Sequence, residues 1–173
     1  MPELRRATAD DLTDPVLDSL TAMIGDLVRD GAALGWTDPP ERRELEALLR
    51  GIVEGAEHDA CAVLALEGSE ALGAGWWQRY AKPTQRHNAD LDKLAVAPQA
   101  AGQGLGRRLL RLLLEQAQTA GIDHLTLDLR EGNERARHLY ATEGFREYGR
   151  LADFVAPGDG TRCAKIFMVR SFA

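Results

Sequence analysis

The feature that most constrains the fold is a strand, helix, strand, helix order that begins at residue 89. Residues 89–96 and 124–129 are predicted as strands, because short apolar-rich runs are bounded there by polar or glycine-containing segments. Residues 105–120 and 134–143 are predicted as helices, the first with an apolar arc of leucine and alanine. Strands joined by a crossover helix pair in parallel, so this half of the chain predicts a parallel pair.

Elements on both sides of this unit complete the prediction. They are strands over residues 4–7, 61–66, 71–80, 145–151 and 165–170, a helix that follows the capping-box pattern Thr8–Asp11 and ends near Gly31, and a helix over residues 41–54. Hairpins pair antiparallel, so their presence beside a crossover predicts a mixed sheet. The fold class is therefore α/β, in the sense of a mixed α+β sheet.

Composition limits the classes of protein to which the chain can belong. With 173 residues, 45% of them hydrophobic and 28% charged, we expect one compact domain over residues 1–173. The net charge of −6 and the pI of about 5.2 do not supply the positive surface that nucleic acid requires, so nucleic acid is not an expected partner. An acidic chain suits a cationic substrate such as an amine, although surplus carboxylates more often reflect a solvated surface.

Targeting and cysteine patterns add further expectations. No apolar run approaches the roughly 18 residues that cross a bilayer, and the start lacks the apolar region of a signal peptide. We expect a cytoplasmic protein with no membrane partner. Cys61 and Cys163 have neither metal-ligand nor redox spacing, so they are expected to be buried thiols, and neither a disulfide nor a metal site is predicted.

A glycine-rich loop follows the strand over 89–96. Gly102, Gly104 and Gly106 lie where that strand gives way to a helix, and the unpaired amides of a first helical turn favour anions. Ligands of such sheets bind at the carboxyl ends of parallel strands, here after Val96 and Leu129. The spacing fits neither the dinucleotide fingerprint nor the Walker loop, because Arg107 stands where each requires another residue.

Two arginines at the start of that helix point to the same kind of ligand. Arg107 and Arg108 oppose the helix dipole, which favours acidic side chains in the first turn by about 0.3 to 1 kcal/mol each. A bound diphosphate would reverse this penalty. The alternative is that arginine, a good helix former, simply extends its guanidinium into water.

Two segments carry a family resemblance. "Leu94-Ala-Val-Ala-Pro-Gln-Ala-Ala-Gly-Gln-Gly-Leu-Gly-Arg-Arg-Leu-Leu110" resembles the acetyl-CoA motif of GCN5-related N-acetyltransferases (GNAT), and "Asn133-Glu-Arg-Ala-Arg-His-Leu-Tyr140-Ala-Thr-Glu-Gly-Phe145" resembles the late helix of that family. The resemblance implies a central mixed sheet of about seven strands flanked by about four helices. It also implies direct acetyl transfer from acetyl-CoA to an amine in a ternary complex, without an acyl-enzyme.

The resemblance assigns residues to acetyl-CoA. It implies that backbone amides of the loop and helix start bind the pyrophosphate, and that backbone donors of the preceding strand bind the thioester carbonyl. The residues that inherit cofactor contacts are Leu94, Ala95, Val96, Ala101, Gly102, Gln103, Gly104, Leu105, Gly106, Arg107, Asn133 and Arg137. Ala101 departs from the family, which places arginine or glutamine there, and Gln99 fits only in a register shifted by two residues. We expect weakened rather than abolished cofactor binding, with compensation from Arg107 or Arg108.

Proton transfer has one candidate acid and two candidate bases. Tyr140 falls on the tyrosine position of the family and is predicted to protonate the departing thiolate, the alternative being a core aromatic residue. Asp90 and Asp92, predicted to share a strand face with Leu94 and Val96, are the candidate bases, the alternative being solvated carboxylates. Deprotonating an alkylamine at pH 7 costs about 4.6 kcal/mol, but an α-amine costs only about 1 kcal/mol and hardly needs a strong base.

The acceptor is the least determined part of the site. "Asp90-Leu-Asp-Lys-Leu-Ala-Val96" and "Gly149-Arg-Leu-Ala-Asp-Phe-Val-Ala-Pro-Gly-Asp-Gly160" are most similar to the tabtoxin-resistance type of acetyltransferase, which implies a small, amino-acid-like amine. Acceptor contacts are expected from residues 152–162 and from the segment around Trp36. A protein or peptide N-terminal acetyltransferase and a non-catalytic acyl-CoA-binding module remain alternatives, and a homodimer follows only from analogy with the family.

Overall fold

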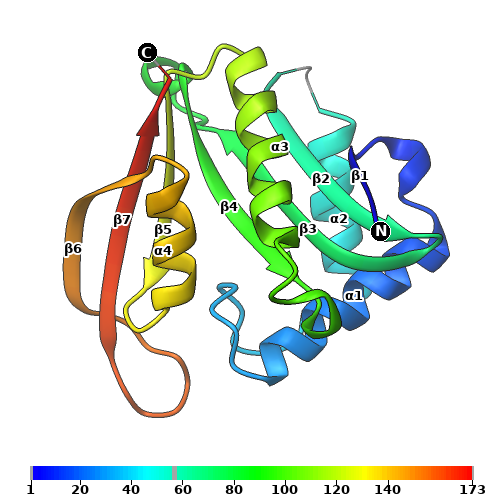
Figure 1. Cartoon of the computed structure of the whole chain (residues 1–173), viewed down its shortest axis with the longest axis horizontal. Coiled ribbons are helices and arrows are strands. Elements are labelled where there is room, and N and C mark those ends of the chain that lie inside the picture. The colour runs from blue at the N-terminus through cyan, green and yellow to red at the C-terminus, as the bar shows by residue number, and fades with distance from the viewer. Residues whose placement is uncertain (1, 56–57, 173) are drawn as a thin grey trace.

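The computed structural model describes residues 2–55 and 58–172. Its helices are α1 (Asp14–Arg29), α2 (Arg42–Val53), α3 (Leu105–Thr119) and α4 (Glu134–Thr142). Its strands are β1 (Glu3–Arg6), β2 (Ala60–Glu67), β3 (Glu70–Arg79), β4 (Asn88–Val96), β5 (His124–Arg130), β6 (Arg146–Val155) and β7 (Cys163–Ser171). Within the described residues the strands form one sheet in the order β1-β2-β3-β4-β5-β7-β6 (Figure 1). The β4–β5 pair is parallel and its neighbours are antiparallel, so the predicted mixed sheet is confirmed.

One local prediction at the N-terminus is wrong. The capping box of Thr8 and Asp11 caps a short 3-10 helix over Ala9–Asp11, and α1 begins only at Asp14. Pro15 lies in the first turn of α1. A backbone N–H there would have no partner within the helix, so the lack of this group in proline costs nothing, and the fixed φ of proline suits a helix. The proline therefore sets the start of the helix, and the capping box belongs to the turn before it.

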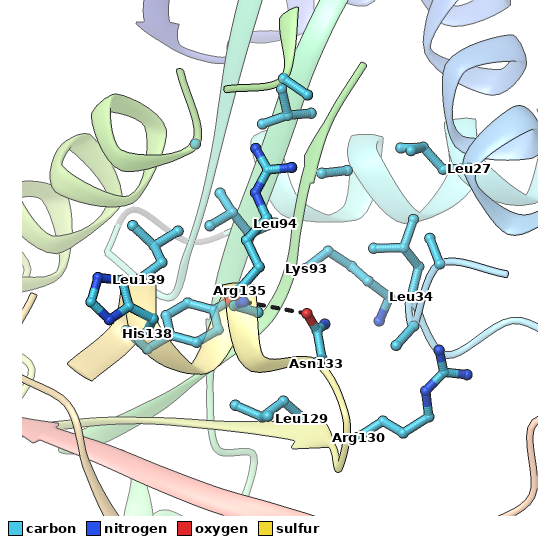
Figure 2. Close-up of a pocket in the computed structure, with 18 of the residues that line it drawn as sticks. Leu27, Leu34, Lys93, Leu94, Leu129, Arg130, Asn133, Arg135, His138 and Leu139 are labelled. Carbon is cyan, nitrogen blue, oxygen red and sulfur yellow. Dashed lines mark hydrogen bonds between the residues drawn. The ribbon is translucent and has the colours of Figure 1, made fainter. Parts of the chain in front are cut away.

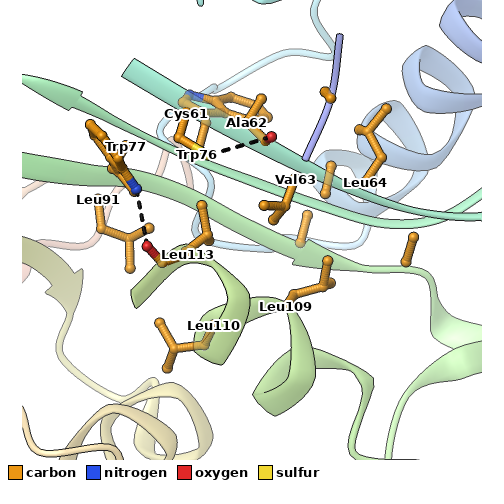
Figure 3. Close-up of a cluster of buried hydrophobic side chains, with 14 of the residues drawn as sticks. Cys61, Ala62, Val63, Leu64, Trp76, Trp77, Leu91, Leu109, Leu110 and Leu113 are labelled. Atoms are coloured by element: carbon orange, nitrogen blue, oxygen red, sulfur yellow. Dashed lines mark hydrogen bonds between the residues drawn. The ribbon is translucent and has the colours of Figure 1, made fainter. Parts of the chain in front are cut away.

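The N-terminal arm, which we define as β1–β4 with α1, α2 and α3, holds the densest packing. Figure 1 shows α3 on one face of these strands and α1 and α2 on the other. A Cβ at Gly73 would lie 2.7 Å from Leu109 Cδ1, and one at Gly75 would lie 2.9 Å from Leu113 Cδ1. These glycines let α3 approach β3 closely, and the buried Trp77 donates its indole N–H to the Leu113 carbonyl at 3.1 Å (Figure 3).

The cysteine prediction is only half right. Cys61 is buried in this core, as expected for a structural thiol, whereas Cys163 is half-buried at the start of β7. Both thiols are free, which agrees with the expectation of no disulfide. Burial raises the pKa of the Cys61 thiol to about 11, so it remains protonated and unreactive at neutral pH.

The C-terminal arm, which we define as β5, β7 and β6 with α4, separates from the N-terminal arm along β4. The parallel strands β4 and β5 pair only from Asn88 to Asp90, and beyond that point they diverge (Figure 1). On its other edge β4 carries a bulge, because Trp76 pairs with Lys93 while Trp77 pairs with Leu91. Asp92 is the extra residue. The predicted alternation of Asp90 and Asp92 with Leu94 is therefore interrupted, since a bulge changes the direction of the side chains around it.

Candidate active site

A cavity of about 720 Å³ occupies the opening between the diverging strands (Figure 2). Its walls come from the end of α1 and the loop after it, from β4, from the glycine-rich loop, and from β5 and α4. One cavity therefore joins the helix-start region to the acidic residues of the sheet. This volume lies in the range of about 300 to 1,000 Å³ that is typical of small-molecule and cofactor sites.

The glycine-rich loop presents unpaired amides to this cavity. In the part of the chain that the structure describes, the backbone amides from Gly102 to Arg107 donate no hydrogen bond to another protein group. Gly102 and Gly104 have φ of +80° and +78°, a conformation that side chains disfavour, and a Cβ on either would meet only open space. Such an arrangement at a helix start can hold an anion such as a phosphate.

The edge of β4 supplies further free backbone groups. Beyond Asp90 the side of β4 that faces β5 has no strand partner within the described residues, and Leu94, Ala95 and Val96 line the cavity. Their opposite edge is fixed by pairing with β3. A rigid strand with one open edge can direct amides at a carbonyl oxygen, which is the geometry that an oxyanion site requires.

Helix α4 places two of the predicted residues on the far wall. Asn133 is the N-cap of α4 and accepts a hydrogen bond from the Ala136 amide at 3.3 Å, as Figure 2 shows. Tyr140 lines the cavity, and its ring packs edge-on against Phe145 at 5.6 Å between centroids. Burial raises the pKa of the Tyr140 hydroxyl, which keeps it protonated at neutral pH.

The side chain of Arg107 has an internal partner that the sequence did not reveal. Its guanidinium pairs with the Glu143 carboxylate at 2.5 Å, and Arg111, one turn further along α3, contacts the same carboxylate at 3.0 and 3.1 Å. The dipole argument for an external anion therefore fails for Arg107. For Arg108, which is exposed and has no ion pair among the described residues, the external anion stays a prediction. Residues four apart lie on the same face of a helix, so the spacing of Arg107 and Arg111 is the sequence signal that could have indicated a shared carboxylate partner.

The two candidate bases differ in position. Asp92 lines the cavity, accepts a hydrogen bond from the indole of the buried Trp76 at 3.0 Å and contacts Lys93. Asp90 does not line it, and accepts from the Thr126 hydroxyl at 2.6 Å. Burial, aided by the nearby carboxylates of Asp128 and Asp92, raises the pKa of Asp90. The structure thus brings Asp92, rather than Asp90, into the opening.

Two predicted cofactor residues lie outside the residues that line the cavity. Gln103 is exposed in the loop and donates its side-chain amide to the Gln99 carbonyl at 3.0 Å. Arg137 is on α4 but pairs with Glu147 at 3.2 Å and with Glu134 at 3.7 Å. A role for either side chain toward a cofactor remains a prediction.

The end of the cavity formed by α1, the loop after it and Lys93, which we name the acceptor end after the predicted role of this region, is walled by residues that the sequence did not single out. Leu27, Ala32, Ala33 and Leu34 form an apolar side near the end of α1, and Lys93 extends toward it (Figure 2). Trp36, predicted to lie near the acceptor, packs its ring against the Lys93 ammonium. None of the lining residues comes from 152–162, the other segment predicted to contact the acceptor.

The described residues lack both a membrane-spanning helix and a cluster of metal-binding side chains. In the ranges 2–55 and 58–172, no helix combines the length and the apolar character needed to span a bilayer. In the same ranges, no group of three or more histidine, cysteine, aspartate or glutamate side chains could hold a metal ion. A cytoplasmic location and a metal-free site stay predictions.

Comparisons with solved structures identify the same architecture. A ribosomal-protein-alanine N-acetyltransferase from Brucella melitensis superposes with a TM-score of 0.85 at 23% identity, over 98% of this chain and 99% of that one. A phosphinothricin acetyltransferase from Sinorhizobium meliloti, solved in complex with acetyl-CoA, gives a TM-score of 0.83 at 21% identity, over 99% and 89% of the two chains. At these identities the likeness establishes the fold.

Comparisons of sequence establish the family. An uncharacterized N-acetyltransferase of the hisH-hisA intergenic region of Azospirillum brasilense is 33% identical over 124 residues, 69% of this chain and 71% of the relative. The bS18-alanine N-acetyltransferase of Escherichia coli K12 is 36% identical over 78 residues, but these cover only 53% of its length. The family model described as "Acetyltransferase (GNAT) family" matches residues 22–145. The chain belongs to the GNAT family and is an acetyl-CoA-dependent N-acetyltransferase.

Proposed function

We propose that this protein transfers the acetyl group of acetyl-CoA directly to a primary amine of a small molecule, within a ternary complex. The observation that carries this proposal is the single cavity that joins the unpaired amides at the start of α3 to Tyr140 and Asp92. An anion site, a candidate acid and a candidate base in one space are the parts that acetyl transfer to an amine requires.

The residues present fit acetyl-CoA. The amides from Gly102 to Arg107 are free to bind a pyrophosphate, and the positive φ at Gly102 and Gly104 lets phosphate oxygens approach the backbone. Arg108 adds a positive charge at the same helix start, and Asn133 lies across the cavity on α4. When bound, acetyl-CoA supplies a thioester whose carbonyl carbon is open to attack by an amine.

The chain then has three tasks at the reacting atoms. Backbone amides in the segment Leu94–Val96 stabilise the negative charge that develops on the carbonyl oxygen, because they are held rigid by β3 and open toward the cavity. Tyr140 donates its hydroxyl proton to the departing sulfur, and its raised pKa ensures that the hydroxyl is still protonated when the thiolate leaves. Asp92 accepts the proton of the amine, directly or through water, at the acceptor end.

A small acceptor is favoured over a protein N-terminus by the walls of the acceptor end. Leu27 and Ala32–Leu34 bring the segment after α1 against the opening, and Arg130 of β5 donates to the Gly31 carbonyl at 3.1 Å. This contact links the two sides of the mouth. The alternative acceptor, a protein N-terminal amine, is favoured by the similarity to the bS18-alanine N-acetyltransferases. The presence of Tyr140 in the cavity argues against a non-catalytic acyl-CoA-binding module.

The test is thiol release from acetyl-CoA against amino acids, polyamines, aminoglycosides and short peptides, with CoA binding measured separately by calorimetry. The expected result is release that depends on a small primary amine and yields its N-acetyl product. Release with peptides alone would favour the protein acetyltransferase. Demonstrated CoA binding with no amine-dependent release across the panel would favour the binding module.

Three broader features stay predictions that this assay does not address. They are a single N-acetyltransferase domain over residues 1–173, a cytoplasmic location and a homodimer. The narrower similarity to the tabtoxin-resistance type likewise stays a prediction, to be judged by which amine proves to be the acceptor.

A further inference from the structure

A lysine of the chain itself occupies the acceptor end of the cavity. Lys93 lines the cavity, and its side chain is only 14% exposed. Its ammonium lies 2.5 Å from Asp92 Oδ1 and 5.1 Å from the centroid of the Trp36 ring. Gly35 also approaches it, since a Cβ there would lie 3.6 Å from Lys93 Nζ. The protein thus holds a primary amine between a carboxylate and an aromatic ring, inside its own acetyl-transfer cavity.

The bulge in β4 explains how this amine meets the candidate base. In a regular strand, consecutive side chains point to opposite faces of the sheet, so Asp92 and Lys93 would be kept apart. The extra residue at position 92 changes that direction, and both carboxylate oxygens of Asp92 are engaged, one by Trp76 and the other by Lys93. Lys93 immediately precedes Leu94–Val96, the segment proposed to hold the thioester carbonyl.

The other two lysines of the chain provide a comparison. Lys165 has similar partners, with its ammonium 2.7 Å from Asp128 Oδ2 and 5.4 Å from the Phe154 and Phe167 rings, but it does not line the cavity. Lys82 is exposed in the loop before β4. Ion pairing and aromatic contact are therefore not special to Lys93, whereas its place in the cavity is.

We propose that Lys93 is a site of self-acetylation, modified in cis by acetyl-CoA bound in the same cavity. The inference rests on the proposed acetyl transfer. Asp92 takes a proton from the Lys93 ammonium, and the neutral amine attacks the thioester carbonyl carbon. A C–N bond forms as the C–S bond breaks, and Tyr140 protonates the sulfur. The second proton released by the Lys93 nitrogen passes through water to the Tyr140 phenolate and restores its hydroxyl. The products are N-acetyl-Lys93, CoA and the proton that leaves through Asp92.

The modification changes the acceptor end. Acetylation removes the charge of Lys93, so the ion pair with Asp92 and the cation–π contact with Trp36 are both lost. Among the described residues, Asp92 then keeps the Trp76 indole as its one side-chain partner and is free to receive a proton from an external amine. Self-acetylation is therefore expected to alter acceptor turnover, by releasing the base from its internal counter-ion.

The experiment incubates the purified protein with isotope-labelled acetyl-CoA and no other amine, and follows each lysine by peptide mass spectrometry. Trypsin does not cut after acetyl-lysine, so modified Lys93 yields the uncleaved peptide of residues 87–107. We expect labelling of Lys93 about 100-fold faster than labelling of Lys82 or Lys165, with a rate constant independent of protein concentration. Lys93→Arg removes this label and Tyr140→Phe slows it about tenfold or more, whereas Lys165→Arg leaves it unchanged.

The outcomes separate this inference from the proposed function. Amine-dependent thiol release together with equal labelling of all three lysines would leave the acetyltransferase function standing and overturn self-acetylation. A labelling rate proportional to protein concentration would show transfer between molecules and also overturn it. CoA binding with neither amine-dependent release nor Lys93 labelling would overturn the proposed function, and the inference with it.

Discussion

The two arms of the sheet differ in how completely their elements are buried. In the N-terminal arm both faces of β2 and β3 are covered, and Trp76, Trp77 and Leu109 are buried among helices on opposite sides. In the C-terminal arm β5 and β7 bury residues such as Leu125 and Ile166. No residue of α4, which the structure describes in full, is fully buried, and β6 leaves Tyr148 and Phe154 54% and 59% exposed. Apolar packing thus extends through all the elements of one arm, whereas in the other it is concentrated in β5 and β7.

Charged contacts join the two arms where they meet, in addition to apolar packing. Glu143, at the end of α4, is the one buried charged side chain among the described residues, and it joins α4 to Arg107 and Arg111 of α3. Its carbonyl also accepts from Arg170 of β7 at 2.5 Å. Tyr140, in the turn just before Glu143, is therefore held both by these ion pairs and by the packing of its ring on Phe145 and the core. The N-terminal arm carries the cofactor loop on densely packed elements, and the C-terminal arm carries the candidate acid on a helix that charged contacts join to α3.

The largest expected effect is on stability in the N-terminal arm. Trp77→Ala removes a fully buried ring and its hydrogen bond to the Leu113 carbonyl, and should lower the free energy of unfolding by about 3 to 5 kcal/mol. Phe154→Ala, in the C-terminal arm, should change it by no more than about 0.5 kcal/mol because the ring is largely exposed. Guanidinium unfolding measures both, and equal losses would contradict the contrast between the arms.

The next effect concerns catalysis in the C-terminal arm. Tyr140→Phe keeps the ring and its contact with Phe145 but removes the hydroxyl, so turnover should fall about 100-fold, equivalent to about 2.7 kcal/mol. The dissociation constant for acetyl-CoA and the unfolding free energy should change little. Steady-state kinetics and calorimetry provide the measurements. Turnover equal to that of the unsubstituted protein would remove Tyr140 as the acid.

A smaller effect is expected where the arms join. Glu143→Gln should lower the free energy of unfolding by about 1 kcal/mol at pH 7, because Arg107 and Arg111 lose a charged partner but remain partly solvated. The arginines hold the pKa of Glu143 below its ordinary value of 4.5. Its contribution is therefore full above pH 4.5 and disappears as the pH falls through the lower pKa of the folded state.

The matched control for that substitution is Glu54→Gln. Glu54 pairs with Arg50 at 3.3 Å on the surface of α2, with 54% of its side chain exposed. Its replacement should change the unfolding free energy by less than about 0.5 kcal/mol. Denaturation curves at several pH values compare the two variants. A Glu143→Gln deficit that persists unchanged in acid would contradict the assigned ion pair.

The smallest effect tests the register of the cofactor loop. Ala101→Arg adds a cation where the cavity wall has only a methyl group, and should tighten the dissociation constant for acetyl-CoA by up to about fivefold. Gln99→Arg is the control, because Gln99 lies two residues earlier and does not line the cavity. Calorimetric titration of both variants with acetyl-CoA decides between the two registers. Tighter binding by Gln99→Arg alone would support the register shifted by two residues.

Local patterns were sufficient to predict most of the elements. The helices over residues 41–54 and 105–120 and the strand over residues 89–96 lie within one residue of α2, α3 and β4, since hydrophobic period and turn residues act over a few positions. The start of α1 was misplaced because two competing start signals, the capping box and Pro15, are only a few residues apart. The glycine loop was located from its spacing, and its unpaired amides follow from the helix start itself.

The residues that join distant segments were beyond local patterns. Glu143 meets Arg107 across 36 positions of sequence, and Lys93 meets the Trp36 ring across 57. The one-residue bulge at Asp92 influences which carboxylate enters the cavity. The alternation of polar and apolar residues along the sequence does not reveal this bulge. Such contacts depend on how strands and helices are placed relative to one another, which is set by packing over the whole core.

The sequence by itself therefore determined the order of elements, the mixed sheet and the resemblance that led to the GNAT family, because these depend on short-range patterns and on two contiguous motifs. Only the tertiary structure decided how far β4 and β5 pair before they diverge, which acid neutralises Arg107, and that Asp92 and Lys93 share the acceptor end. The physical reason is that burial and charge pairing act through space, so each partner is chosen by the fold rather than by its neighbours in the chain.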